Sequence, residues 1–408
     1  MRRLWLVLSA VALAPVLVGC GDTEALPRLA VGEAPDLGVL RVADPSGVSL
    51  LDTDTARFTS RIRNGVRSRD WVFQSRLTPE GTRLLAVSPL GEVAWQRDLD
   101  GDQSARVVSS DGSRVALLPF GDGTTDPYHP AGRSRTHLTV VSTDTGELDE
   151  YDLDGNFEPE AFASSGESLF VIEYVPATAP TSYRVRKLDL TTGEIGPVYS
   201  VDGHLQESMQ GTARVQALTA DGRRLYTLYT TPDGAAFVHV LDLEEEWAHC
   251  VDLPSPIGSS GEQHLAIAAD PSGARVLVVD TLAGAAEIDA GSLTVTDTLA
   301  GSVPEQEPGQ AMAVVTDDGR LLAGRGMALY VIGSDLQLLD VWRLATPMLG
   351  LYRDPDADRG VVWFLGDEAM YALDDTTGEV IEAAALPDDM PPLEVPAAPS
   401  TMPIQCAC

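Results

Sequence analysis

A short turn followed by an apolar run recurs along most of the chain, and this repeat limits the possible folds more than any other feature. Each copy places a glycine, usually after an acidic residue or serine, before a Leu- or Val-rich run. The glycines of the copies are Gly81, Gly112, Gly166, Gly222, Gly273, Gly319 and Gly360. Because glycine adopts positive φ at little cost, each copy predicts a tight turn leading into a buried strand.

A second element follows the copies: an apolar strand that ends in aspartate, a Gly-containing turn, and another strand. It is clear at 140–147, 187–194 and 371–379, with variants at 240–243 and 287–291. Together the two elements predict a four-stranded unit. The seven turn glycines are separated by 31, 54, 56, 51, 46 and 41 residues. A period of roughly 40 to 50 residues with four strands per unit is typical of a β-propeller.

The segments 39–42, 48–52 and 58–62 also have the composition of strands, but no turn copy precedes them. We expect them to complete the blade that begins near Leu349, which would close the ring and remove its exposed edges. The sequence therefore predicts an all-β protein: a propeller over residues 37–386 with four-stranded antiparallel blades. Seven blades are expected, or eight if the N-terminal segment stands alone.

The phrases Asp-Gly-Arg-Arg-Leu-Tyr at 221–226 and Lys-Leu-Asp-Leu-Thr-Thr-Gly-Glu at 187–194 resemble those of WD-repeat-like and YVTN-like bacterial propellers. The resemblance covers about residues 38–386 and implies the fold. The recurring Gly-His and Trp-Asp pairs of true WD repeats are missing, so the partners of that family are not carried over. The resemblance to YVTN-like lactonases implies an alternative function, a cation-dependent enzyme whose carboxylates gather a divalent ion.

The N-terminus is typical of an exported lipoprotein. Arg2 and Arg3 precede an apolar run that is too short to span a bilayer comfortably, so residues 1–19 are expected to be a signal peptide. The run ends in Leu17-Val18-Gly19-Cys20, which resembles the bacterial lipobox. This resemblance implies that Cys20 is the lipid attachment site, carrying acyl chains such as palmitate. An ordinary signal peptide followed by an unrelated cysteine is the alternative.

Composition restricts the partners. The formal net charge is −33, and removal of Arg2 and Arg3 makes it −35, with the acidic residues spread along the chain. Nucleic acid is excluded as a partner because contact with phosphates needs a basic face. The same charge opposes anionic lipid headgroups, so the membrane is expected to be contacted only through the anchor. This places the protein on a cell membrane or outer membrane, facing the periplasm or the exterior.

Residues 20–36 are expected to form the lipidated cysteine and a polar tether, and residues 387–408 a Pro-rich extended tail. Export permits disulfides, and Cys250 could pair with Cys406 or Cys408 of this tail. A buried free thiol at Cys250 is the alternative. A metal or redox role for Cys406 and Cys408 lacks nearby partner ligands.

No motif of a known catalytic or metal site occurs in the sequence, which has no Gly-x-Ser-x-Gly, His-Glu-x-x-His, P-loop or Cys-x-x-Cys. The histidines are expected to be separate turn or outer-strand residues, and the tryptophans to pack between blades. They are His129, His137, His204, His239, His249 and His264, and Trp71, Trp95, Trp247, Trp342 and Trp363.

Two acidic triplets, Asp98-Leu99-Asp100-Gly101-Asp102 and Asp152-Leu153-Asp154-Gly155-Asn156, have the alternation of a Ca²⁺ loop. Glycine is fourth rather than sixth, and the twelfth positions hold Ser109 and Ala163, which favours solvated turns over a structural Ca²⁺ site. The segment 120–130 lengthens one unit and carries Phe120 and His129, so it is either a binding loop or a plain surface loop.

These observations predict a membrane-anchored scaffold that binds an envelope protein or an extracellular ligand and uses no resident cofactor. The alternatives are the cation-dependent lactonase-like enzyme and, by analogy of fold and anchor, an envelope assembly factor.

Overall fold

The computed structural model describes residues 39–386, apart from 45–46, 64, 69–70, 89, 121–130, 200–211, 232–233, 302–307 and 355–358. This part consists of strands and turns, with one 3-10 turn, η1 (Glu262–His264). Within it, no helix is long and apolar enough to cross a membrane. The predicted signal peptide, Cys20, tether and C-terminal tail lie outside the described residues.

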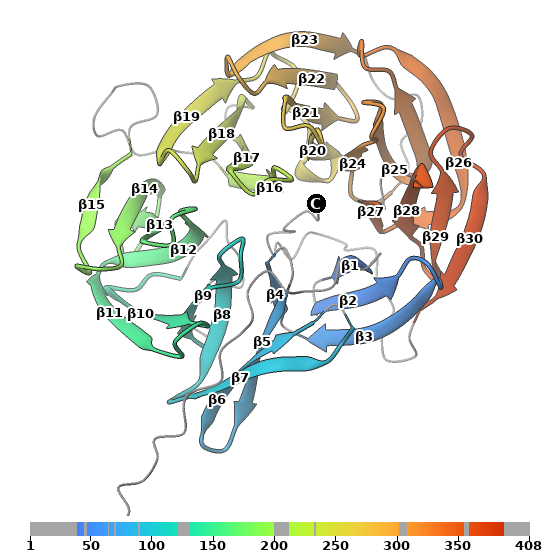
Figure 1. Cartoon of the computed structure of the whole chain (residues 1–408). Helices are drawn as coiled ribbons and strands as arrows, with labels where there is room; N and C mark the ends of the chain where they lie inside the picture. The colour runs from blue at the N-terminus through green and yellow to red at the C-terminus, as the bar shows by residue number, and fades with distance from the viewer. Residues whose placement is uncertain are drawn as a thin grey trace, which may run out of the picture.

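The strands form eight separate antiparallel sheets arranged as a ring, which we name blades A to H in chain order (Figure 1). The strands of blades A to D are β1 (Val39–Asp44), β2 (Gly47–Asp52), β3 (Arg57–Arg63); β4 (Gly65–Arg67), β5 (Val72–Thr78), β6 (Gly81–Val87), β7 (Val93–Leu99); β8 (Gln103–Val108), β9 (Arg114–Pro119), β10 (Arg135–Ser142), β11 (Leu148–Asp154); β12 (Asn156–Phe162), β13 (Ser168–Val175), β14 (Ser182–Asp189) and β15 (Ile195–Val198).

The strands of blades E to H are β16 (Thr212–Leu218), β17 (Arg224–Thr230), β18 (Ala236–Asp242), β19 (Trp247–Asp252); β20 (Leu265–Ala269), β21 (Arg275–Asp280), β22 (Gly284–Asp289), β23 (Thr294–Ala300); β24 (Met312–Val315), β25 (Leu321–Ile332), β26 (Leu338–Met348); β27 (Gly350–Arg353), β28 (Val361–Leu365), β29 (Ala369–Asp374) and β30 (Val380–Ala385). In blade G, β25 takes the places of both the second and the third strand: its residues 321–324 pair with β24 and its residues 326–332 pair with β26. Gly326, where φ is +60°, lies at the change from one partner to the other.

The expected count of seven blades is wrong, and the eight-bladed alternative is correct. The N-terminal strands β1–β3 pair only with one another among the described residues, and β27–β30 form a complete blade by themselves. The ring is closed by side-chain packing between blades H and A, which share no strand. Leu40 and Val42 of β1 lie in one buried cluster with Trp363 of β28. Apolar burial between two complete sheets is sufficient to join them, so no strand exchange is needed.

The predicted turns are confirmed at five glycines, where the glycine N–H donates to the carbonyl oxygen three residues earlier. These are Gly112, Gly166, Gly222, Gly273 and Gly319, whose φ angles lie between +71° and +82°. Gly81 is not a member of this set. It follows the turn between β5 and β6, at the opposite end of its blade, and its φ is +140°. In blade B the equivalent turn is closed by the Ser68 N–H and the Trp71 carbonyl oxygen.

The core is divided among the seams between neighbouring blades. Each of the eight seams contains at least one cluster of buried apolar side chains, and the seam between blades D and E contains two. Most of the predicted inter-blade tryptophans lie there as expected: Trp71 and Trp95 in the B–C seam, Trp342 in the G–H seam and Trp363 in the H–A seam, while Trp247 packs against the edge of the E–F cluster.

The two ends of the ring differ. The turns between first and second strands, and between third and fourth strands, lie at one end, which we name the turn end. The other end carries the connections between blades and between second and third strands, and we name it the loop end. The four longest connections, residues 120–134, 199–211, 253–264 and 301–311, all belong to the loop end. Long connections on one side of a repeat fold commonly carry its binding residues.

Candidate functional site

A cleft of about 270 Å³ lies at the loop end between blades B and C. One wall is the end of β5, Gln74 to Leu77, and the other is the start of β8, Gln103 and Ser104, with Phe120 at the edge. Arg76, Leu77 and Phe120 are exposed. A volume of this size is at the lower limit of ligand pockets, so it suits one or two residues of a bound peptide better than a large cofactor.

Gln103 is the buried polar group of this cleft. Its backbone is held at the start of β8 because the Gln103 N–H donates to Thr82 Oγ1 at 2.7 Å, and Thr82 Oγ1 in turn donates to the Gly101 carbonyl oxygen at 2.9 Å. The residue is only 8% exposed, and its Oε1 has no hydrogen-bond partner among the described residues. A buried acceptor without a partner costs free energy, which a ligand with an N–H group would recover.

Phe120 and Arg76 complete the chemistry of the cleft. The Phe120 N–H donates to the Asp102 carbonyl oxygen at 2.7 Å, which fixes the start of the long connection beside the cleft. The ring of Phe120 is 58% exposed, and Leu77 across the cleft is 47% exposed. Arg76 Nη2 donates to Gln74 Oε1 at 3.2 Å. The cleft therefore offers two apolar side chains and a cation, and the amide oxygen of Gln103 is buried in its wall.

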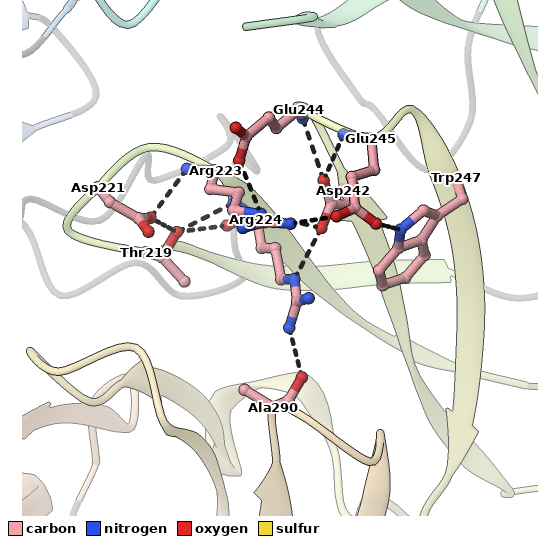
Figure 2. Close-up of polar contacts among 9 residues, drawn as sticks. All are labelled: Thr219, Asp221, Arg223, Arg224, Asp242, Glu244, Glu245, Trp247 and Ala290. Carbon is pink, nitrogen blue, oxygen red and sulfur yellow. Dashed lines mark hydrogen bonds and ion pairs between the residues drawn. The ribbon is translucent and has the colours of Figure 1, made fainter.

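The turn end carries a network of charged groups that holds neighbouring blades together. In blade E the fully buried Asp242 carboxylate lies 2.9 Å from Arg224 Nε and 3.4 Å from Arg223 Nε. Figure 2 shows Asp242 between the two arginines, with Arg224 extending to the Ala290 carbonyl oxygen of blade F. Burial alone would raise the pKa of Asp242, but hydrogen bonds from the Glu245 N–H and from Arg224 lower it.

The same link recurs at later seams. Arg275 of blade F donates to carbonyl oxygens of Gly319 and Ser334 in blade G. Arg320 of blade G lies 3.2 Å from Asp375 Oδ1 of blade H, and Arg359 Nη1 donates to the Thr53 carbonyl oxygen of blade A at 2.6 Å. Because these arginines satisfy backbone and carboxylate groups of the next blade, the network is structural and is not a binding site.

The D–E seam contains a row of polar side chains across one face of blade E. The strand register places Gln216 opposite Thr227, Thr227 opposite His239, and His239 opposite Cys250. Gln216 Nε2 donates to Thr227 Oγ1 at 3.0 Å. His239 is fully buried, and neither ring nitrogen has a hydrogen-bond partner among the described residues. Burial, together with the nearby His249, lowers the pKa of His239 to about 4.

His239 and Cys250 occupy opposing positions on β18 and β19, but the imidazole makes no hydrogen bond to the thiol in the described structure. A histidine that activates a thiol needs such a contact, so this pair is not arranged for nucleophilic catalysis. Cys406 and Cys408 lie outside the described residues, and the disulfide from Cys250 stays a prediction.

Tyrosines and one acid complete the D–E seam. Tyr183 of β14 stacks on Tyr229 of β17 with ring centroids 5.2 Å apart, and Tyr229 stacks on Phe237 at the same distance. Glu160 lies at a bulge in β12, where the pairing with β13 skips from Pro159 to Ala161. Neither of its carboxylate oxygens has a partner among the described residues, and burial raises the pKa of Glu160 to about 7. Such groups are frequent at functional sites.

The two acidic triplets do not assemble ligand sets in the described structure. Asp98 binds Arg83 at 2.6 Å, Asp152 lies 3.1 Å from His137, and Asp154 lies 3.2 Å from Arg135. Asn156 is buried and donates through Nδ2 to the carbonyl oxygens of Ala131 and Ala177. These side chains therefore contact protein groups instead of converging on a cation.

The described histidines are spread over three blades: His137 in blade C, His239 and His249 in blade E, and His264 beside blade F. Nδ1 of His264 lies 2.9 Å from Thr281 Oγ1 and 2.9 Å from Arg325 Nη1. Burial and the Arg325 charge lower the pKa of His264. His129 and His204 lie outside the described residues. Among the described residues, no group of three or more His, Cys, Asp or Glu side chains is placed to hold a metal ion.

Sequence reasoning missed Gln103 and Glu160. Gln103 follows an acidic turn with no local motif, and the unpaired position of Glu160 depends on a bulge that composition does not reveal. Phe120 belongs to the segment 120–130, which the sequence marks as a lengthened unit, but its neighbours Leu77 and Arg76 come from another blade. The cleft is thus formed by the pairing of blades and not by a contiguous motif.

Comparison with known proteins gives no family. No protein-family model matches the sequence, and no curated protein matches it significantly. Solved structures similar to the chain include dihydro-heme d1 dehydrogenase NirN (13% identity, 90% of this chain and 66% of that one, TM-score 0.49), BamB from Moraxella catarrhalis (12%, 83% and 94%, 0.40) and a prolyl endopeptidase (14%, 79% and 49%, 0.46). The chain thus spans just under two thirds of the first protein and about half of the third. At such identities the likeness concerns the fold alone.

Proposed function

We propose that this protein is an exported, lipid-anchored β-propeller that acts as a scaffold and binds a segment of a partner protein at its loop end. The observation that carries the proposal is the cleft between blades B and C. There a buried amide oxygen without a partner lies beside a cation and two exposed apolar side chains. These are the groups that a peptide backbone N–H, an acidic or carbonyl oxygen and an apolar side chain would contact.

The entry point of the chain supports this orientation. Val39, the first residue of β1, pairs with Asp52, which immediately precedes the turn between β2 and β3 at the turn end. A tether of residues 20–36 joined to a lipidated Cys20 would therefore lead to the turn end. With the anchor on that side, the loop end and its cleft are free to face a partner away from the bilayer.

The cation-dependent alternative is not carried further, because the acids from several blades that it requires are not brought together in the described part of the chain. The envelope assembly factor is one member of the proposed class of scaffolds. No observation on the cleft selects that partner over another.

Two variants of the cleft and one control test the proposal. Phe120→Ser removes the exposed ring, and Gln103→Leu removes the amide acceptor while filling a similar volume. Leu148→Ser is the control, because Leu148 is an exposed apolar residue of β11 in blade C, 37% exposed and outside the cleft. The full chain and each variant would be cross-linked in the native envelope, and the recovered partner would be identified. Loss in both cleft variants with retention in the control is expected.

Equal recovery of the same partner with all three variants would contradict binding through the cleft. The anchor is tested separately by Cys20→Ala, which should abolish incorporation of labelled palmitate and release the protein from membranes. Unchanged labelling would contradict the anchor without affecting the cleft.

A further inference from the structure

In five blades a bulge lies near the start of the last strand, just after the turn at the turn end, and the pairing of the last two strands skips a single residue there. Blade D has a wider irregularity at the same place, between Ile195 and Val198. The skipped residues are Thr59 in blade A, Ala94 in B, Thr296 in F, Leu339 in G and Ile381 in H. A small or polar residue thus occupies this position in three blades, and a large aliphatic one in the neighbouring blades G and H.

Leu339 and Ile381 belong to a larger apolar patch. They are 59% and 54% exposed, and the adjacent Leu338, Val341 and Val380 are exposed too. These residues make up five of the ten exposed large apolar side chains in the described part of the chain. Scattered single apolar residues are normal on a protein surface, but exposed apolar side chains gathered on the outer strands of two neighbouring blades mark an interaction site.

Contacts between blades G and H fix the patch in place. Gly378, in the turn before β30, lies so close to the Trp342 ring of β26 that an added Cβ would clash with it. Arg320 of blade G also binds Asp375 of blade H at 3.2 Å. The two halves of the patch are therefore held together before any partner arrives, which lowers the entropic cost of binding.

The charges around the patch indicate the chemistry of its partner. Asp335, Asp340 and Glu379 are exposed next to the apolar residues, whereas Arg343 is the exposed cation that follows on β26. An acidic border disfavours an anionic bilayer and favours a basic protein surface. In addition, β26 and β30 are the outermost strands of their sheets in the described structure, so their edges are available for pairing.

We propose that this patch, formed by Leu338, Leu339, Val341, Val380 and Ile381, docks an extended segment of a partner protein that presents aliphatic and basic side chains. The surface lies on the outer wall of blades G and H, distinct from the loop-end cleft. The proposal does not depend on the function proposed for that cleft.

The test uses defined peptides and variants that copy the residues of the other blades. Leu339→Thr with Ile381→Thr gives blades G and H the residue of blades A and F. Val93→Thr is the matched control, because Val93 is 54% exposed on the fourth strand of blade B. Labelled peptides of about ten residues that alternate lysine with valine or lysine with serine would be titrated into the full chain and followed by fluorescence anisotropy.

The lysine–valine peptide is expected to bind at least about tenfold more tightly than the lysine–serine peptide to the unmodified chain and to Val93→Thr. The double variant should lose this difference, and added salt should weaken the binding. Equal affinity for the two peptides, or no effect of the double variant, would overturn the proposal. Patch-dependent flotation with phosphatidylcholine or phosphatidylglycerol vesicles, or patch-dependent self-association in sedimentation, would also overturn it by assigning the patch to the bilayer or to a second copy.

Discussion

The two seams on either side of blade E are built in different ways. The E–F seam buries fifteen side chains, all aliphatic except Tyr226. The D–E seam divides into a small cluster that is aliphatic except for Phe170 and a group of tyrosines. It also buries Glu160 and His239, whose side chains have no hydrogen-bond partners among the described residues. Both seams use the same strands of blade E. Alternation along β18 turns Val238 and Val240 toward F, and Phe237 and Leu241 toward D.

The free energy of apolar burial explains the side chains of the E–F seam, but it does not explain Glu160 and His239 in the D–E seam. An aliphatic seam gains free energy from every buried side chain, whereas a buried acid or imidazole without a partner loses it. The E–F seam is therefore expected to depend little on pH between 6 and 8, where the Asp242 carboxylate that joins it through Arg224 stays charged. The D–E seam should weaken at both alkaline and acidic pH, because Glu160 charges in one direction and His239 in the other.

The largest expected effect comes from the aliphatic seam. Leu228 is fully buried in the E–F cluster, and Leu228→Ala should lower the free energy of unfolding by about 2 to 5 kcal/mol, through lost burial and the cavity left behind. Urea unfolding of the full chain measures this. Leu77→Ala, at an exposed position, serves as the control. A loss below about 1 kcal/mol for Leu228→Ala would mean that the seam relaxes around the gap.

Glu160→Gln should flatten part of the pH dependence. The pKa of Glu160 is about 7 in the folded protein against an ordinary value of 4.5, so its neutral form is favoured and stability is lost as pH rises between these values. At pH 8 the loss is about 3 kcal/mol. The variant should therefore gain melting temperature over the unmodified chain at pH 8 and little at pH 4.5. Glu150→Gln, on the exposed face of β11, is the control. An equal gain at both pH values would contradict the assignment.

His239→Phe should act in the opposite direction. The pKa of His239 is about 4 in the folded protein against an ordinary 6.5, so the neutral ring is favoured and stability is lost as pH falls from 6.5 through 4. At pH 4.5 the charge would cost about 2 kcal/mol. Melting curves at pH 4.5 and 7 should show the variant more stable than the unmodified chain only at the lower pH. His137→Phe, at the exposed ion pair with Asp152, provides the comparison.

The smallest effect concerns an ion pair across the D–E seam. Lys187 Nζ lies 2.5 Å from Glu246 Oε2, and both side chains are about one quarter exposed. Lys187→Met should lower the free energy of unfolding by less than about 1 kcal/mol, because water and salt screen exposed pairs. Thermal melting at low and high salt would check this. A larger loss would show that the D–E seam relies on this pair more than on its apolar clusters.

The repeat was predictable because its chemistry is local. The Asp-Gly pairs at Gly112, Gly222 and Gly319 predict a tight turn from two adjacent residues, and the apolar run after each pair predicts the buried strand. The same local signal placed Gly81 at the wrong end of its blade, because a Glu-Gly turn has a similar composition at either end. The count of seven blades was wrong because β1–β3 lack a turn copy, and it is their pairing with one another, separate from β27–β30, that makes them a blade.

The site residues depend on relations that a linear pattern does not contain. Gln103 and Phe120 meet Leu77 because blades B and C pack side by side. His239 and Cys250 were each visible in the sequence, but their opposition follows from the register of β18 and β19. Glu160 is turned into the seam by a bulge, and the surrounding sequence Glu158-Pro159-Glu160 resembles an ordinary acidic stretch.

Hydrogen exchange of the full chain at pH 6 and pH 8 tests the contrast between the two seams most directly. After correction for intrinsic exchange, β13 and β14 of blade D should lose protection at pH 8, while β21 and β22 of blade F keep theirs, and Glu160→Gln should restore protection in blade D. Equal protection of the two blades at both pH values would contradict the contrast between the D–E and E–F seams.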